Sequence, residues 1–248
     1  MKTDKFQRRF YRDKLGRGDL HLAIVCVGQT DLGVLTDKPV SAAFLRERIK
    51  FYRRIIESYI AKDSLFLSSL KPIPLDFTAD PIIKEMGCAA RLANVGPMAS
   101  VAGSIAQFLG EDLLKRGLKE VIVENGGDIF LKIARTRRVG IYSGSNKLFK
   151  NLCIIVQPKD TPMGICTSSG TVGHSLSFGS ADSVVILAKS APLADAVATA
   201  TGNLVKSKDD LRAAVGFAKS IKGVRAAAVV IGDTLIALGK IKFSRCQS

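Results

Sequence analysis

The sequence predicts an α+β protein with mixed, mainly antiparallel sheets and packed helices, and three observations support this class. Short runs of β-branched and aliphatic residues are separated by Gly, Asn and Arg, as in strands joined by turns. Segments with helical periodicity occur between these runs but do not follow every strand, which argues against a strict β-α-β succession. The chain of 248 residues is 47% hydrophobic and has no linker-like run, which favours one compact domain.

The many basic side chains in residues 1–20 indicate a basic N-terminal arm, and we expect the domain to comprise residues 21–248. The arm is the densest part of a diffuse net charge of +15, which raises polyanions, nucleotides or acidic proteins as partners. Its aromatic residues are too few and too irregular to form a platform for stacking bases. A solvated arm is therefore favoured, and nucleic acid is not expected as a partner.

The first half of the domain predicts a hairpin, three helices and one loop. Apolar residues alternate on both sides of Gly28, as in a hairpin. Pro97 suits the first turn of a helix and Gly117 its end. Small residues near the start of that helix allow close approach of a ligand or of another backbone. The expected ranges are strands at 21–27 and 32–35, helices at 41–61, 82–96 and 97–115, and a Pro-containing loop at 71–80.

The second half predicts consecutive strands, two helices and a closing hairpin over Gly232 and Asp233. The expected strands are 120–123, 129–134, 139–142, 152–156 and 184–188, the helices are 192–205 and 209–221, and the hairpin strands are 225–231 and 234–238.

The cysteines and the hydropathy pattern exclude several classes of protein. The five cysteines are odd in number and contain no Cys-x-x-Cys pair, so we expect neither a disulfide framework nor a zinc site. No run of about 18 apolar residues occurs, and the N-terminus does not resemble a signal peptide. We therefore expect a cytoplasmic protein without a membrane segment.

Two glycines interrupt what would otherwise be one strand from residue 121 to residue 131. Gly126 and Gly127 weaken a strand unless its backbone must turn or must be approached closely. Asp128 would then project at the bend. Asn125-Gly126 is also a common hairpin turn, so a plain turn is an equally good interpretation.

Asp195 and Thr199 are four residues apart in a predicted helix, so their side chains share one face. A carboxylate and a hydroxyl are hard oxygen ligands, and a magnesium ion held by them would take further oxygens from a phosphate. The alternative is that Asp195 only stabilises the first turn of its own helix through the helix dipole.

A third stretch, residues 164–174, is rich in small residues and hydroxyl groups, so a ligand could approach its backbone. His174 is a candidate for ligand contact, although a loop histidine is often only a surface residue. Cys166 has two interpretations, a reactive thiol with a lowered pKa or a small buried residue. The three stretches together predict one pocket, with Asp128 and His174 on opposite rims.

Four segments together resemble the ApbE-like superfamily, and more narrowly its uncharacterised archaeal and bacterial branch. The resemblance covers residues from about 28 to about 239. The segments are Val95-Gly-Pro-Met-Ala-Ser-Val-Ala-Gly103, Val123-Glu-Asn-Gly-Gly-Asp-Ile129, Cys166-Thr-Ser-Ser-Gly-Thr-Val-Gly-His-Ser175 and Ala194-Asp-Ala-Val-Ala-Thr-Ala200.

The resemblance implies an ApbE-like domain. Flavin transferases of that family move FMN from FAD to a Thr or Ser of a target protein, using magnesium. Two family features are missing here, because residues 98–102 contain no Lys and residues 174–179 contain neither Asp nor Pro. We therefore expect binding of a phosphate-bearing ligand, a flavin such as FAD or FMN or another nucleotide, with magnesium, but not ordinary flavin transfer.

An alternative is a non-catalytic or sulfur-assimilation accessory protein with a reactive Cys166, and a protein partner is compatible with either function. The residues and the resemblance together give three sets of candidates. The metal ligands are Asp195 and Thr199, the catalytic candidates are His174, Asp128 and Cys166, and the cofactor-binding residues are Asn125, Gly126, Gly127, Asp128, Thr167, Ser168, Ser169, Gly170 and His174.

Overall fold

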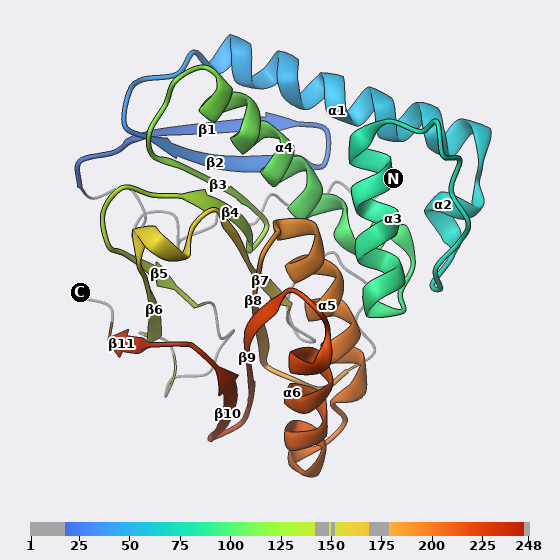
Figure 1. The fold of residues 1–248 in the computed structure, drawn as a ribbon, viewed down its shortest axis with the longest axis vertical. Helices are drawn as coiled ribbons and strands as arrows, with labels where there is room; N and C mark the ends of the chain where they lie inside the picture. Colours follow the sequence, from blue (N-terminus) through green and yellow to red (C-terminus); the bar gives the residue numbers. More distant parts are fainter. Residues whose placement is uncertain (1–17, 142–148, 150–151, 169–178, 246–248) are drawn as a thin grey trace, which may run out of the picture.

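The computed structural model describes residues 18–141, 149, 152–168 and 179–245, and these residues form three layers (Figure 1). A layer of helices covers one face of an eight-stranded sheet with the order β1-β2-β3-β4-β7-β8-β9-β10. A three-stranded sheet with the order β11-β6-β5 lies against the other face. All strand pairs in both sheets are antiparallel, so the predicted α+β class is confirmed.

The large sheet is built mainly from consecutive strands. Its strands are β1 His21–Val27, β2 Thr30–Thr36, β3 Val121–Asn125, β4 Asp128–Lys132, β7 Met163–Ser168, β8 Ser183–Ala188, β9 Val224–Ile231 and β10 Thr234–Gly239. The small sheet contains β5 Arg137–Gly140, β6 Leu152–Val156 and β11 Phe243–Arg245.

Among the described residues the helix layer holds five long helices and one short one. They are α1 Ala42–Lys62, α2 Leu65–Ser68, α3 Pro81–Ala93, α4 Val101–Lys115, α5 Ala191–Leu204 and α6 Leu211–Ser220. A 3-10 turn at Pro97–Ser100 leads into α4. None of the helices in the described part of the chain is both long and apolar enough to span a membrane.

Strand alternation divides the apolar residues between two interfaces. On β3, Val121 and Val123 pack with the helices, whereas Ile122 packs with the residues between the two sheets. The neighbouring strand β4 does the same, with Phe130 on the helix side and Ile129 on the other. The face of the large sheet that carries each polar residue therefore follows from its position in the strand.

Apart from shifted ends, the predicted elements agree with the structure except at two strands, at the short helix α2, which was not predicted, and at the start of α4. β7 was predicted to be a loop because of its small residues, and β11 was not predicted. The helix predicted to begin at Pro97 starts instead as the 3-10 turn and continues as α4. No disulfide framework was expected, but Cys153 is disulfide-bonded, whereas Cys26, Cys88 and Cys166 are not.

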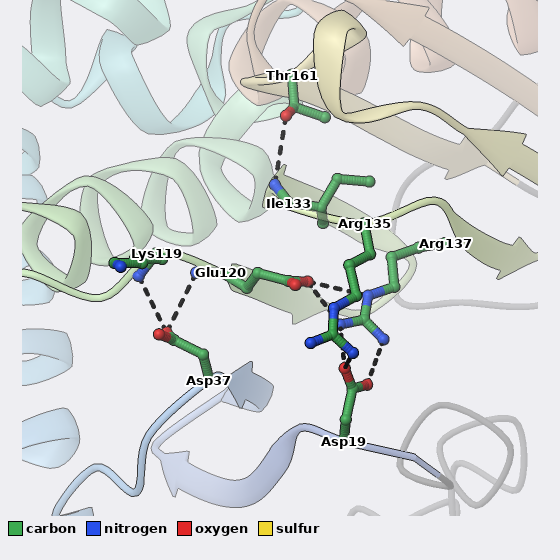
Figure 2. Close-up of polar contacts among 8 residues, drawn as sticks. All are labelled: Asp19, Asp37, Lys119, Glu120, Ile133, Arg135, Arg137 and Thr161. Atoms are coloured by element: carbon green, nitrogen blue, oxygen red, sulfur yellow. Dashed lines mark hydrogen bonds and ion pairs between the residues drawn. The ribbon is translucent and has the colours of Figure 1, made fainter.

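An ionic network connects the start of the described chain to both sheets (Figure 2). The Arg137 guanidinium on β5 donates to Glu120 Oε2 at 2.6 Å and to Asp19 Oδ1 at 2.5 Å. Arg135 also donates to Asp19, at 3.0 Å. The hydrogen bond from Arg137 lowers the pKa of Asp19 to about 2. Asp19 therefore stays charged and anchored, although its side chain is exposed.

Candidate functional site

The predicted pocket residues converge where β3, β4 and β7 meet the first turns of α4 and α5. Asn125 is paired with Asp128, and Asp128 is paired in turn with Cys166 across three adjacent strands. Cys166 packs in the core between the sheet and the helices, so by strand pairing these three side chains share the helix-facing side of the sheet. Asp195, on α5, lies above them.

The β3–β4 connection is a two-residue turn. Gly126 and Gly127 have φ values of 70° and 103°, a left-handed backbone that non-glycine residues rarely adopt. Two contacts hold the turn: the Glu124 carboxylate accepts from the Gly127 N–H at 2.8 Å, and the Thr167 N–H donates to the Gly127 carbonyl at 3.2 Å. The two glycines therefore form a hairpin turn, and the same turn places Asp128 at the end of β4.

Asn125 connects this hairpin to α4. Its Nδ2 donates to the Ala102 carbonyl at 3.1 Å, in the first turn of the helix. The side chain is buried, so this bond satisfies a donor that would otherwise be costly to bury. Asn125 thus connects the end of β3 to the start of α4.

Asp195 interacts with α4 and not with the first turn of its own helix. It is the fifth residue of α5, and its Oδ2 accepts from the Gly103 N–H at 2.8 Å. The interpretation in which Asp195 serves only its own first turn is therefore wrong, because the free N–H groups that it satisfies belong to α4. Desolvation raises the pKa of Asp195 to about 7, against the lowering effect of the Gly103 and Ala102 amides.

Cys166 does not have the surroundings of a reactive thiol. Its side chain is fully buried, and Sγ lies 3.4 Å from the Ala191 carbonyl. Burial, followed by the nearby carboxylates of Asp128 and Asp195, raises the pKa of the Cys166 thiol well above its usual value. Of the two interpretations of Cys166, the small buried residue is confirmed and the reactive thiol with a lowered pKa is wrong, because burial favours the neutral thiol.

The small residues around the site allow backbones to approach closely. A Cβ atom on Gly103 would lie 2.5 Å from the Ala191 oxygen and 3.0 Å from the Asp195 Cβ. A Cβ on Gly164 of β7 would lie 2.4 Å from the Ala191 Cα. Gly103, one of the small residues predicted near the start of α4, and Gly164 are thus required for the tight packing of α4, α5 and β7 around Ala191.

The structure brings together some of the candidate residues and leaves others undecided. Asp128, Cys166 and Asp195 are close enough for both carboxylates to act on the thiol. Thr199 is half-buried, one turn beyond Asp195. Thr167 points to the opposite face of β7 from Cys166, because adjacent strand residues alternate. Ser169, Gly170 and His174 lie outside the described residues.

Two further residues at the site had not been singled out. Glu124 holds the glycine turn, and Gln107 of α4 accepts from the Ala191 N–H at 2.8 Å. Gln107 lies one helical turn after Gly103, so the sequence already placed it on the face of the helix that carries the small residues. Within the described ranges no cluster of three or more His, Cys, Asp or Glu side chains could hold a metal ion, so a cation here would need other oxygens as well.

Comparison with known proteins gives relatives over most of the chain. A family model described as AbpE bacteria matches residues 12–234. A UPF0280 protein of Methanosarcina acetivorans is 38% identical over 221 residues, which cover 88% of this chain and 87% of that protein. A UPF0280 protein of Methanocella arvoryzae is 38% identical over 215 residues, with 87% of each covered.

Solved structures with the same fold are more distant in sequence. The flavin transferase ApbE from Vibrio cholerae superposes with a TM-score of 0.56 at 14% identity, covering 92% of this chain and 97% of that one. The apo flavinyl transferase ApbE from Pseudomonas stutzeri gives a TM-score of 0.54 at 14% identity, covering 88% and 93%. At these identities the similarity establishes the ApbE-like fold and nothing finer.

Proposed function

Since the chain belongs to the family described as AbpE bacteria, we propose that it binds a flavin nucleotide through its phosphates and a magnesium ion, in the pocket between α4, α5 and the β3–β4 hairpin. The fold that it shares with flavin transferases supports a flavin, and the oxygen-rich side chains of the pocket support the metal. The proposal concerns binding, and it leaves the reaction open.

The position of Asp195 carries this proposal. Its carboxylate is held by neutral backbone N–H groups, and no Lys or Arg side chain in the described part of the chain forms an ion pair with it. A half-buried carboxylate in that situation is stabilised by a cation, and the raised pKa reflects the same need. Thr199 offers a second hard oxygen on the same helix face.

The residues present fit a magnesium ion. Mg²⁺ favours one or two protein oxygens together with water and phosphate oxygens, so Asp195 and Thr199 are sufficient without a third acidic side chain. When bound, the ion would offset the negative charge of the phosphates. Asp195 would hold it, and Asn125 and Asp128 would border the ligand from the sheet.

The reactive-thiol alternative has less support. An accessory protein that carries sulfur on Cys166 would need a thiolate open to solvent, whereas this thiol is buried between a carbonyl and two carboxylates. Efficient flavin transfer is not part of the proposal either, because the Lys and the Asp-Pro segment of the transferases are missing.

The test is a thermal-unfolding series with magnesium and a set of ligands. FAD, FMN, ADP and riboflavin are each compared with and without Mg²⁺, and EDTA removes contaminating metal. We expect stabilisation to require both Mg²⁺ and a phosphate. At a ligand concentration of about 100 Kd the gain is about 2.7 kcal/mol, which corresponds to roughly 5–10 °C for a chain of this size.

The ligand set separates the parts of the proposal. A shift with FAD and FMN but not with ADP supports a flavin, and a shift with all three indicates a nucleotide or phosphate site. Riboflavin lacks phosphate and should give no magnesium-dependent shift. If Mg²⁺ leaves every melting curve unchanged, the proposal is wrong.

A further inference from the structure

Helices α4 and α5 cap each other's N-terminal turns through side chains. The Gly103 N–H of α4 donates to Asp195 of α5 at 2.8 Å, and the Ala191 N–H of α5 donates to Gln107 Oε1 of α4 at 2.8 Å. Gly103 and Gln107 are one turn apart, and so are Ala191 and Asp195. The two bonds therefore join the same two faces of an antiparallel helix pair, one turn apart.

The start of α5 depends on Gln107 because its own cap residue does not serve it. Ser190 occupies the N-cap position but makes no side-chain capping hydrogen bond. The first N–H groups of a helix have no partner within the helix, and Ala191 is fully buried. Gln107 therefore accepts from the buried Ala191 N–H, which the Ser190 side chain does not satisfy.

A second contact fixes the orientation of the Gln107 amide. Its Nε2 donates to Glu111 Oε1 at 3.0 Å, one turn further along α4. Because the carboxylate accepts only from the amino group, the amide oxygen must point toward the Ala191 N–H. Glu111, Gln107 and Ala191 form a chain of hydrogen bonds that ends at the N-terminus of the helix carrying Asp195.

We infer that Gln107 is a positioning residue that holds the first turn of α5 and thereby the carboxylate of Asp195. Ala191 lies on the same helix face as Asp195, one turn before it, and its carbonyl contacts the Cys166 thiol. Without the Gln107 hydrogen bond, the first turn of α5 becomes more mobile. The distance between Asp195 and Gly103 is then no longer fixed, and the Ala191 carbonyl no longer shields the Cys166 thiol. The link to ligand affinity rests on the proposed function, whereas the link to Cys166 does not.

The first readout needs no ligand. Native protein is treated with N-ethylmaleimide, and the modified cysteines are located by peptide mass spectrometry, with the exposed Cys26 and Cys88 as internal references. We expect Gln107→Met to raise the rate of Cys166 modification by about tenfold, as local opening becomes easier. The double variant Gln107→Glu/Glu111→Gln exchanges the two groups, keeps both hydrogen bonds and should restore the wild-type rate.

The second readout is the Kd of FAD in the presence of Mg²⁺, by titration calorimetry. Gln107→Met should weaken binding by about tenfold, and the exchange variant should recover it. A matched control is Ser207→Ala, which removes the side-chain cap of the turn before α6 and so lowers stability away from the site. It should change neither the Cys166 rate nor the affinity. If Gln107→Met does not fold, Gln107→Asn replaces it, because its side chain is one methylene shorter and moves the amide away from the Ala191 N–H.

The two readouts distinguish the possible failures. If the wild type binds no ligand but Gln107→Met exposes Cys166 and the exchange variant protects it, the proposed function fails and the positioning of α5 stands. If Cys166 reacts at the wild-type rate in Gln107→Met and Gln107→Asn, the inference is overturned whatever the ligand does. It is also overturned if Ser207→Ala reproduces both effects.

Discussion

Two groups of carboxylates in this molecule have opposite surroundings. At the junction of the two sheets, Asp19 and Glu120 share the guanidinium of Arg137, and the pKa of Asp19 falls to about 2. Between α4 and α5, Asp195 is held by backbone N–H groups, and its pKa rises to about 7. The Asp19 side chain is exposed to solvent, whereas Asp195 is half-buried between α4 and α5.

The difference separates a structural carboxylate from one suited to binding a cation. Where a positive side chain is built into the fold, the charge is compensated and the contact stabilises the chain itself. Where only neutral donors hold the carboxylate, its charge is oriented but not compensated, which is typical of sites that bind an ion. The following predictions test this division, beginning with the largest expected effect.

Asp195→Asn should weaken Mg²⁺-dependent FAD binding by about 100-fold, since a charged contact contributes roughly 1.5–3 kcal/mol. The fold should persist, because the amide oxygen still accepts from the Gly103 N–H. Titration calorimetry measures the affinity. Asp112→Asn is the matched control, since Asp112 pairs with Arg48 at the other end of α4 and should leave the affinity unchanged.

Glu120→Ala should lower the free energy of unfolding by about 1–3 kcal/mol, because it deprives Arg137 of a nearly buried partner. Chemical denaturation measures this loss. FAD affinity should not change, because the network lies at the junction of the sheets. A parallel loss of affinity in Glu120→Ala would show that the two regions are coupled and would break the comparison.

Between about pH 4 and pH 7, Asp195 should make the ligand-free protein less stable as the pH rises. Its pKa is higher in the folded state, so in this window the folded chain binds more protons than the unfolded chain, and the free energy of unfolding falls with pH. A single carboxyl group changes the number of bound protons by at most one, which limits the slope to about 1.36 kcal/mol per pH unit. The difference between wild type and Asp195→Asn in denaturation series isolates this contribution, and parallel curves would contradict it.

The smallest effect is expected at Cys166. Cys166→Ala should change Mg²⁺-dependent FAD affinity by less than about threefold, because a neutral buried thiol contributes no charge to a ligand. In the wild type, N-ethylmaleimide should modify Cys26 and Cys88 well before Cys166. Rapid modification of Cys166, or loss of binding in the variant, would restore the thiol as a functional group.

Much of the fold was predictable because its elements have strong local patterns. The hairpin of β1 and β2 and the long helix α1 follow from alternation and from helical periodicity. β7 was missed for a physical reason: Gly164 and its small neighbours are required by the close approach of Ala191, but in the sequence they have the composition of a loop. The disulfide of Cys153 was missed because an odd number of cysteines gives no pairing.

The convergence of some candidate residues was predictable, but their contacts were less so. Asp128 and Asp195 were expected in one pocket, and both act on the Cys166 thiol. Spacing alone could not show that Asp195 serves α4, because that contact joins residues far apart in the sequence. The roles of Gln107 and Glu124 also depend on tertiary contacts, which a single sequence does not display.

The contact at Gly103 has a consequence for sorting related sequences. A side chain at this position would collide with the Ala191 carbonyl and with the Asp195 Cβ, so the close approach of the two helices requires glycine here. The glycine thus reports the close packing of the two helices, whereas the aspartate reports the carboxylate that accepts from the Gly103 N–H. Glycine and aspartate retained together at these two positions are therefore a better criterion for a preserved pocket than overall identity.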